Sequence, residues 1–209
     1  MDAVEAGSRL NELLTGAGLA ALDAEKQRQL GDYFSLFVRW NERLNLSAIR
    51  DEEGIMSRHL IESIFVARVL PDAVRSLLDF GSGAGLPGIP IALCRREIAV
   101  TLSESQGKKA AFLREAVRVL GIEARVHSGR AETLDGAFDC VILRAVDRMA
   151  KAVEAASGLV APLGWLAVMT TQGELKEHAA AAGAGFQFDE VLTLPGSTQR
   201  RVLALARRS

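Results

Sequence analysis

The stretch LLDFGSGAGLPGIPIAL, residues 77–93, constrains the fold of this chain more than any other segment. It places four glycines and two prolines between an apolar, strand-like run and a helix pattern. Gly81, Gly83 and Gly85 let the backbone turn tightly and approach a ligand, because glycine has no Cβ atom, and Pro87 suits the first turn of a helix. Ligands of open parallel sheets bind beyond the carboxyl ends of the strands. The segment predicts a site for a dinucleotide, a site for another adenosine cofactor, or a turn without a ligand.

Strand and helix patterns alternate from Ser76 onward. Apolar runs predict strands at 76–80, 98–104, 124–129, 138–145 and 164–171, with helices beginning near Pro87, at 107–121 and at about 147–161. The last two runs, 188–196 and 200–208, resemble a closing antiparallel pair. Alternating strands and helices indicate an α/β fold with a parallel sheet covered on both faces.

The first 70 residues instead show helical periodicity. Leu30, Phe34 and Phe37 recur at helical spacing after Asp23, a favourable N-cap residue, and a second helix pattern runs over 52–70 until Pro71. We therefore expect an N-terminal helical extension over 1–72 and an α/β domain over 73–209, packed as one compact unit.

Composition narrows the class of protein. With 209 residues, 49% hydrophobic and 24% charged, the chain fits one globular domain with a small appendage. The formal net charge of −1 indicates no polyanion partner by itself, although basic pairs recur at 95–96, 108–109, 200–201 and 207–208. We expect no signal peptide, no membrane span, and free thiols at Cys94 and Cys140, typical of a cytoplasmic protein. His59, His127 and His178 lack the spacing of metal ligands, so we expect no metal.

Acidic residues favour one cofactor over another. Gly83, Gly85 and Gly88 form a GxGxxG pattern, and Glu104 ends the next strand, where a carboxylate accepts from ribose hydroxyls of NAD or of any adenosine cofactor. Asp79 precedes the glycines, and Glu132 is placed to accept from an adenine amino group. Carboxylates disfavour a pyrophosphate but suit a cofactor that carries an amino group and a sulfonium. The sequence therefore favours S-adenosylmethionine.

The segment DFGSGAGLPGIPIAL, together with WNERLNLSAIRD, RHLIES and LRA, resembles the glucose-inhibited division protein B family of bacterial 16S ribosomal RNA guanine-N7 methyltransferases. The resemblance runs from about residue 30 to the C-terminus. It implies a class I (Rossmann-like) S-adenosylmethionine-dependent methyltransferase fold with an N-terminal helical extension. It also implies methylation of N7 of one guanosine, with 16S ribosomal RNA or the small ribosomal subunit as partner. We expect a cytoplasmic monomer.

The resemblance also implies cofactor contacts at Gly81, Leu86, Ala131, Glu132 and Arg144, and an acidic ribose ligand at Glu104. The glycine pattern adds Gly83 and Gly85 to the expected cofactor contacts. Ser105, Lys108 and Lys109 match a serine–lysine stretch of the family. Two positions depart from its pattern: Gln172 stands where lysine is common, and Glu62-Ser63 stands where aspartate-serine is common.

Five further residues are candidates for contacting the substrate, namely Asn41, Asn45, His59, Arg200 and Arg201. Each has a structural alternative: helix packing or a C-terminal cap for the asparagines, an internal hydrogen bond for His59, and strand pairing for the arginines. Arg144 has the alternatives of a cofactor contact, a phosphate contact and a local ion pair. Guanine N7 has an exposed lone pair and loses no proton on methylation, so alignment can supply the rate and we predict no catalytic base.

Other functions stay open on the residues alone. They are a methyltransferase for protein or a small molecule, an NAD-dependent oxidoreductase, and a non-catalytic RNA-binding assembly factor. An oxidoreductase would need a substrate domain after the glycine segment, for which little chain remains. Aromatic residues are 5% of the chain and form no RNA-recognition signature, so RNA as substrate depends on the resemblance and the basic pairs.

Overall fold

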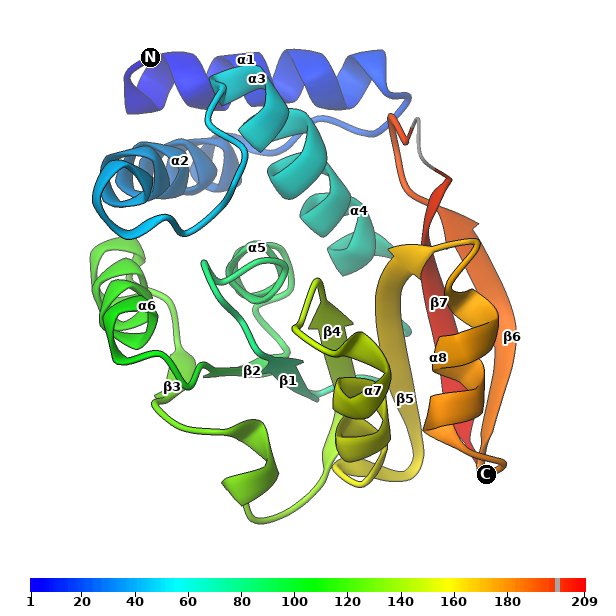
Figure 1. The fold of residues 1–209 in the computed structure, drawn as a ribbon. Helices are drawn as coiled ribbons and strands as arrows, with labels where there is room; N and C mark the ends of the chain where they lie inside the picture. The colour runs from blue at the N-terminus through cyan, green and yellow to red at the C-terminus, as the bar shows by residue number, and fades with distance from the viewer. Residues whose placement is uncertain (198–199) are drawn as a thin grey trace.

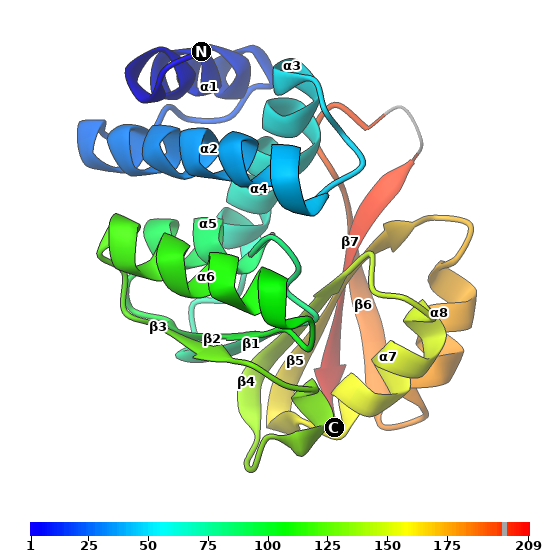
Figure 2. The same ribbon diagram turned by 60° about the vertical axis from the view of Figure 1, so that its left-hand side comes forward.

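Residues 1–197 and 200–209, which the computed structural model describes, contain a seven-stranded sheet in the order β3-β2-β1-β4-β5-β7-β6 (Figures 1 and 2). The strands are β1 (Ser76–Phe80), β2 (Ala99–Ser103), β3 (Ala124–His127), β4 (Phe138–Arg144), β5 (Val160–Thr171), β6 (Phe186–Thr193) and β7 (Arg201–Arg208). β1 pairs in parallel with β2 and β4, whereas β7 runs antiparallel between β5 and β6. The predicted parallel sheet and its closing antiparallel pair are confirmed.

Helices cover both faces of this sheet. They are α1 (Ala3–Gly16), α2 (Ala24–Leu44), α3 (Glu52–Ile55), α4 (Glu62–Val69), α5 (Gly88–Cys94), α6 (Gly107–Leu120), α7 (Met149–Ser157) and α8 (Leu175–Ala182), with a π-helical stretch at Met56–Ile61 and a 3-10 turn at Ala131–Thr133. Asp23 caps α2 as predicted, its carboxylate accepting from the Lys26 N–H. Helix α8 has no counterpart in the prediction.

The largest error in a predicted boundary lies between α7 and β5. The helix expected over about 147–161 ends at Ser157, and β5 begins at Val160 instead of 164. The reason is pairing: Val160 lies opposite Phe138 at the start of β4, so this segment is already sheet. An apolar helix end and an apolar strand start look alike in sequence.

The buried side chains divide between the two faces. Leu77 and Leu102 point into a cluster shared with α1, α2, α4, α5 and α6, whereas Leu78 and Val141 point into a cluster shared with α7 and α8. This alternation follows from the two-residue repeat of a strand. The first cluster joins the N-terminal helices and the sheet into one continuous core, so α1 and α2 are buried against the same surface as α5 and α6.

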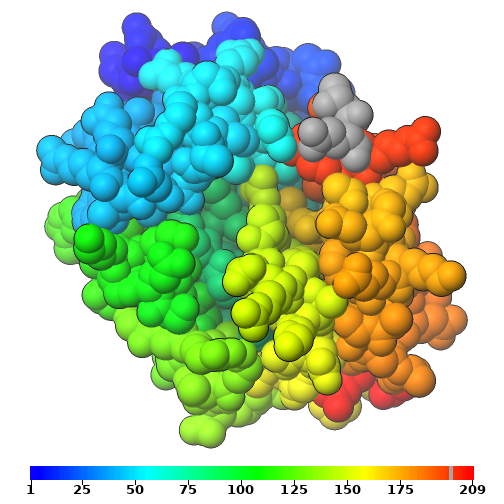
Figure 3. Space-filling view, viewed as in Figure 1, coloured from blue at the N-terminus to red at the C-terminus, as the bar shows by residue number. Residues whose placement is uncertain are grey.

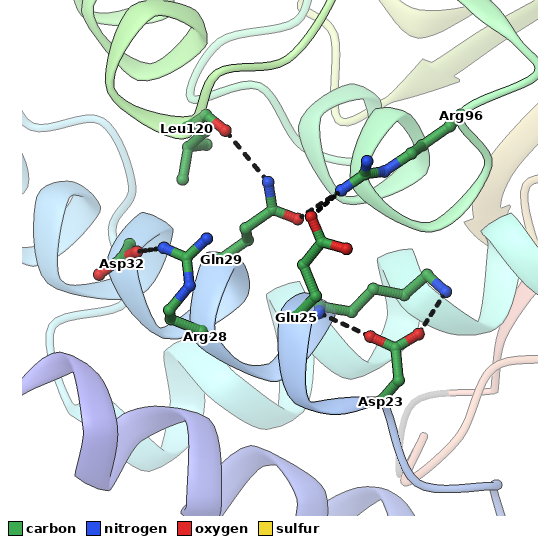
Figure 4. A network of polar contacts seen from close by, with 8 residues as sticks. Asp23, Glu25, Arg28, Gln29, Asp32, Arg96 and Leu120 are labelled. Carbon is green, nitrogen blue, oxygen red and sulfur yellow. Dashed lines mark hydrogen bonds and ion pairs between the residues drawn. The ribbon is translucent and has the colours of Figure 1, made fainter.

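Polar contacts also tie the N-terminal helices to the sheet region (Figure 4). The Gln29 side chain on α2 donates to the Leu120 carbonyl at 3.1 Å and accepts from Arg96, which also pairs with Glu25. The Tyr33 hydroxyl, fully buried, donates to the Ala84 carbonyl at 2.6 Å. Ala84 lies in the glycine loop after β1, so α2 supports that loop directly.

None of the helices in the described ranges is both long enough and apolar enough to cross a bilayer.

Candidate functional site

Two adjoining pockets open at the carboxyl ends of β1, β2 and β4, where the glycine loop lies. The first has a volume of about 510 Å³ and is lined by Phe80, Gly81, Ser103, Ser105, Gly129, Arg130, Ala131, Glu132, Val146, Asp147, Arg148, Lys151 and Ala152. The second has a volume of about 400 Å³ and is lined by Leu46, Ser47, Ala48, His59, Gly81, Ser82, Gly83, Ala84, Leu86, Glu104, Ser105, Gln106, Lys109, Arg144, Ala145, Val146 and Asp147. They share Gly81, Ser105, Val146 and Asp147. In Figure 3 the surface is hollowed between the green segment of α6 and the yellow segment of α7.

The glycines of the loop have two different roles. Gly81 and Gly83 have positive φ angles of 72° and 57°, and a Cβ on Gly83 would contact only the Gly81 carbonyl oxygen, at 3.9 Å. Gly85 lines neither pocket: a Cβ there would lie 2.4 Å from Ile89. A Cβ on Gly88 would lie 2.4 Å from Leu102. Gly81 and Gly83 therefore open the pocket, whereas Gly85 and Gly88 let α5 pack closely on the sheet.

Asp79 does not line either pocket, contrary to the expectation that its carboxylate faces the ligand. It shares the strand face of Leu77, is 1% exposed, and accepts a 3.0 Å hydrogen bond from the Gly88 N–H. Burial raises the pKa of Asp79 to about 7, against the opposing effect of that hydrogen bond. Asp79 fixes the start of α5 from beneath the loop.

Glu104 has the position expected of it at the end of β2. One carboxylate oxygen accepts from the Gly83 N–H at 2.9 Å, and the other accepts from the Gln106 N–H at 2.7 Å. A carboxylate offers about four lone-pair sites, so acceptor capacity remains on the side that lines the second pocket. Glu104 both holds the glycine loop and presents a negative charge to the pocket.

Ala131 and Glu132 lie in the short 3-10 turn after β3 and line the first pocket. Ala131 is buried, whereas the Glu132 side chain is 36% exposed and pairs with Arg130 at 2.8 Å. This ion pair lowers the pKa of Glu132, so the carboxylate is charged at neutral pH.

The loop between α2 and α3 forms the opposite wall of the second pocket, and Asn41 holds it. Asn41 is 3% exposed; its side chain accepts from the Ser47 N–H at 2.8 Å and donates to the Ile49 carbonyl at 3.2 Å. Asn45 is the left-handed C-cap of α2 and accepts from Arg50. Both asparagines therefore shape the loop that carries Ser47 into the pocket.

A buried charged cluster closes the second pocket from behind. Glu62, 1% exposed, lies 3.1 Å from Arg144 and 2.8 Å from Arg201, so one carboxylate serves two guanidinium groups. Burial raises the pKa of Glu62, and the charges of Arg144 and Arg201 oppose that rise. This cluster joins the ends of β4 and β7 to α4.

Arg144 also contacts His59, which lies on the π-helical stretch. Its Nη2 atom lies 2.9 Å from His59 Nδ1, and the His59 Nε2 atom lies 2.8 Å from the Ser47 hydroxyl. Burial, and then the Arg144 charge, lower the pKa of His59 to about 3. His59 is therefore neutral at physiological pH and forms part of a chain from Arg144 to Ser47.

Arg200 and Arg201 lie outside the two pockets. Arg200 is exposed, and its backbone carbonyl accepts from the Gln172 N–H at 3.0 Å. Arg201 is engaged with Glu62, whereas Lys109 lines the second pocket. Within residues 1–197 and 200–209, no group of three or more His, Cys, Asp or Glu side chains is arranged to hold a metal ion.

The fold brings to the site further residues that no local sequence pattern identifies. Ser47 stands within the segment WNERLNLSAIRD, and Glu62 is a departure from the family pattern. Val146, Asp147 and Lys151 follow β4 and line the first pocket. No spacing rule links residues 47, 62 and 144, which come from separate elements, so no local signal identifies them.

The sequence comparisons agree with the geometry. The model of the family described as rRNA small subunit methyltransferase G matches residues 26–202. A Stenotrophomonas maltophilia protein named ribosomal RNA small subunit methyltransferase G is 44% identical over 89% of this chain and 90% of its own length. One of the same name from Xanthomonas campestris pv. campestris (strain B100) is 38% identical over 94% of this chain and 93% of its own.

Solved structures match the fold at lower identity. A predicted O-methyltransferase from Agrobacterium tumefaciens superposes with a TM-score of 0.60 at 22% identity, over 70% of this chain and 80% of that chain. A ribosomal protein L11 methylase from Lactobacillus delbrueckii subsp. bulgaricus gives a TM-score of 0.60 at 13% identity, over 76% and 80%. The class I methyltransferase fold is therefore confirmed, and it differs from a dinucleotide-binding sheet of order 3-2-1-4-5-6 by the antiparallel β7 between β5 and β6.

Proposed function

Because this chain belongs to the rRNA small subunit methyltransferase G family, we propose that it transfers a methyl group from S-adenosylmethionine to N7 of a guanosine in small-subunit ribosomal RNA. The observation that carries the proposal is the double pocket at the glycine loop. It offers a nucleoside-sized space beside Ala131 and Glu132 and a second space that opens between Glu104, the loop at Ser47 and Arg144. Ribosomal RNA as substrate assigns the protein to the cytoplasm.

The residues present fit the cofactor. Gly83 leaves the pocket wall open where a Cβ would stand, and Glu104 retains acceptor capacity for ribose hydroxyls. Ala131 and Glu132 would hold the adenine, and Gly81 and Leu86 would hold the amino-acid end. When bound, S-adenosylmethionine supplies an electrophilic methyl group on a sulfonium.

The protein's own contribution to rate is alignment. Guanine N7 is already a nucleophile and loses no proton, so no side chain needs to act as a base. Holding the base and the methyl donor in line gives a large rate gain by itself. His59, with its pKa lowered to about 3, could not serve as a base near pH 7 in any case, because it binds protons too weakly.

We now expect Asn41 and Arg201 to position the site instead of touching RNA, since both are engaged inside the protein. Arg200 remains a candidate for a phosphate contact because it is exposed, and the structure adds Lys109, which lines the second pocket.

The proposal is tested by calorimetry and by methyl transfer. S-adenosylmethionine and S-adenosylhomocysteine should bind, and NAD should not. Tritiated methyl groups should then appear in small-subunit ribosomal RNA and be recovered as 7-methylguanosine after nuclease digestion. Label in protein or small metabolites without label in RNA would refute the substrate, and tight binding of NAD alone would refute the cofactor.

A further inference from the structure

The hydrogen-bond chain Arg144–His59–Ser47 fixes the proton on His59. A guanidinium only donates hydrogen bonds, so His59 Nδ1, 2.9 Å from Arg144 Nη2, must be the acceptor in that contact. The single proton of the neutral ring is therefore on Nε2. This nitrogen lies 2.8 Å from the Ser47 hydroxyl and donates to it.

Ser47 consequently has its acceptor capacity filled. A serine hydroxyl has two lone pairs and one proton. One lone pair accepts from His59 Nε2, and the other accepts from the Ile49 N–H at 3.1 Å. Among residues 1–197 and 200–209, no acceptor takes the hydroxyl proton. Ser47 lines the second pocket, so its hydroxyl is a hydrogen-bond donor, and only a donor, toward whatever enters there.

A donor of this kind distinguishes the two purines. Guanine carries an acceptor, O6, beside N7, whereas adenine carries an N6 amino donor at the same place. A hydroxyl that only donates forms a hydrogen bond with guanine O6 but leaves the N6 amino group of adenine without a partner. Arg144 Nη1 is a further unpartnered donor within the described residues, but that atom is buried and inaccessible to a base.

We propose that Ser47 is a specificity-determining residue that donates to O6 of the target guanine, with His59 and Arg144 as the positioning residues that keep it a donor. This inference rests on the proposed function, because it assumes that guanine N7 is the methyl acceptor. The same contact orients N7, since O6 and N7 lie on one edge of the base.

The test is a double-mutant cycle in which one change is Ser47→Ala and the other is removal of O6 from the target base. The methylated guanosine is first mapped with wild-type enzyme by borohydride reduction and aniline cleavage. Small subunits are then reconstituted with guanosine or with 2-aminopurine riboside, which lacks O6, at that position. For each enzyme, kcat/KM is measured on both substrates, and cofactor affinity is measured by calorimetry.

Wild-type enzyme should prefer guanosine over 2-aminopurine by about 10- to 100-fold, and Ser47→Ala should reduce this preference to near one without changing cofactor affinity. His59→Phe, which keeps the ring but removes the donor to Ser47, should reduce the preference by several-fold. Ser47→Thr, which keeps the hydroxyl, should keep the wild-type preference for guanosine that Ser47→Ala loses.

An unchanged preference in Ser47→Ala overturns the inference, and so does a fall in its cofactor affinity, which would place the hydroxyl on S-adenosylmethionine. If Ser47→Ala does not fold, as judged by circular dichroism, His59→Phe decides by the same ratio. Absence of 7-methylguanosine with wild-type enzyme is a different result, and it refutes the proposed function itself.

Discussion

The second pocket has two walls that are built by opposite means. The wall beside the glycine loop consists of backbone: Gly81 and Gly83 in left-handed conformations, held by the Glu104 carboxylate. The far wall of the second pocket consists of side chains, with Ser47, His59 and Arg144 in one chain of hydrogen bonds. The glycine wall depends on the absence of side-chain atoms, and the opposite wall depends on charged groups. We therefore expect mutations in the glycine wall to weaken binding and mutations in the charged wall to reduce the free energy of unfolding.

The largest effect is expected in the charged wall. Glu62→Ala leaves Arg144 and Arg201 buried without their shared partner, and breaking a buried pair in this way costs about 3–5 kcal/mol. Urea unfolding should show this loss in the free energy of unfolding. Glu177→Ala, at an exposed site on α8, is the control and should change it by under about 0.5 kcal/mol. Equal stability of the two variants would mean that the cluster is not structural.

The backbone wall should lose mainly binding. Gly83→Val adds a branched side chain whose Cβ would contact only the Gly81 carbonyl oxygen, so the variant should fold by circular dichroism, with some loss of stability because Gly83 has a φ of 57°. Cofactor affinity should fall by more than about 100-fold, since the new side chain occupies the approach to the loop. Gly121→Val, with a φ of 61° and open space around its Cβ at the C-cap of α6, is the matched control for backbone strain. Unchanged calorimetric affinity in Gly83→Val would mean that the loop is only a turn.

The pH dependence of stability tests the role of Asp79, which supports the glycine loop from beneath and does not line the pocket. The pKa of Asp79 is raised to about 7 in the folded protein from an ordinary value of 3.8, so the native state binds more protons than the unfolded chain between these values. The free energy of unfolding should therefore fall as pH rises from about 4 to about 7, and the Asp79 contribution should be constant above that.

Asp79→Asn removes this dependence and keeps an acceptor for the Gly88 N–H. At pH 8 the variant should gain more than about 1 kcal/mol relative to wild type, and at pH 4 the advantage should vanish. Urea unfolding at several pH values measures the difference. A constant difference across that range would show that Asp79 does not titrate there.

The smallest effect concerns the two neighbouring arginines. Arg200→Ala removes an exposed charge, so RNA affinity should fall a few-fold and the salt slope should flatten by about 0.7. Stability should stay within about 0.5 kcal/mol. Arg201→Ala should instead destabilise the fold, because it breaks an ion pair with Glu62. Filter binding over a salt series measures RNA affinity, and urea unfolding of both variants measures stability. A loss of stability in Arg200→Ala, or unchanged stability in Arg201→Ala, would contradict these roles.

The same contrast explains what the sequence could predict. The glycine loop, Glu104 and the alternation of strands and helices follow from residues close together in the chain, so their patterns are local and could be recognised. The prediction that the Asp79 carboxylate faces the ligand is wrong, because proximity in sequence does not show which face of a strand packs against α5. Ser47, Glu62 and Arg201 come from the α2–α3 loop, α4 and β7, and only tertiary packing brings them together.

The hydrogen bond from Tyr33 to the Ala84 carbonyl joins groups 51 residues apart and makes helix α2 part of the loop's support. A ligand that binds only the ordered loop also stabilises any segment that must stay folded for the loop to be ordered. The free energy needed to unfold such a segment rises by RT ln(1 + [L]/Kd). Amide protons along the inner face of α2 should therefore exchange with deuterium more slowly once the cofactor is bound, although α2 contributes no residue to either pocket. Hydrogen exchange in α2 would therefore change when the cofactor binds, although α2 does not contact it.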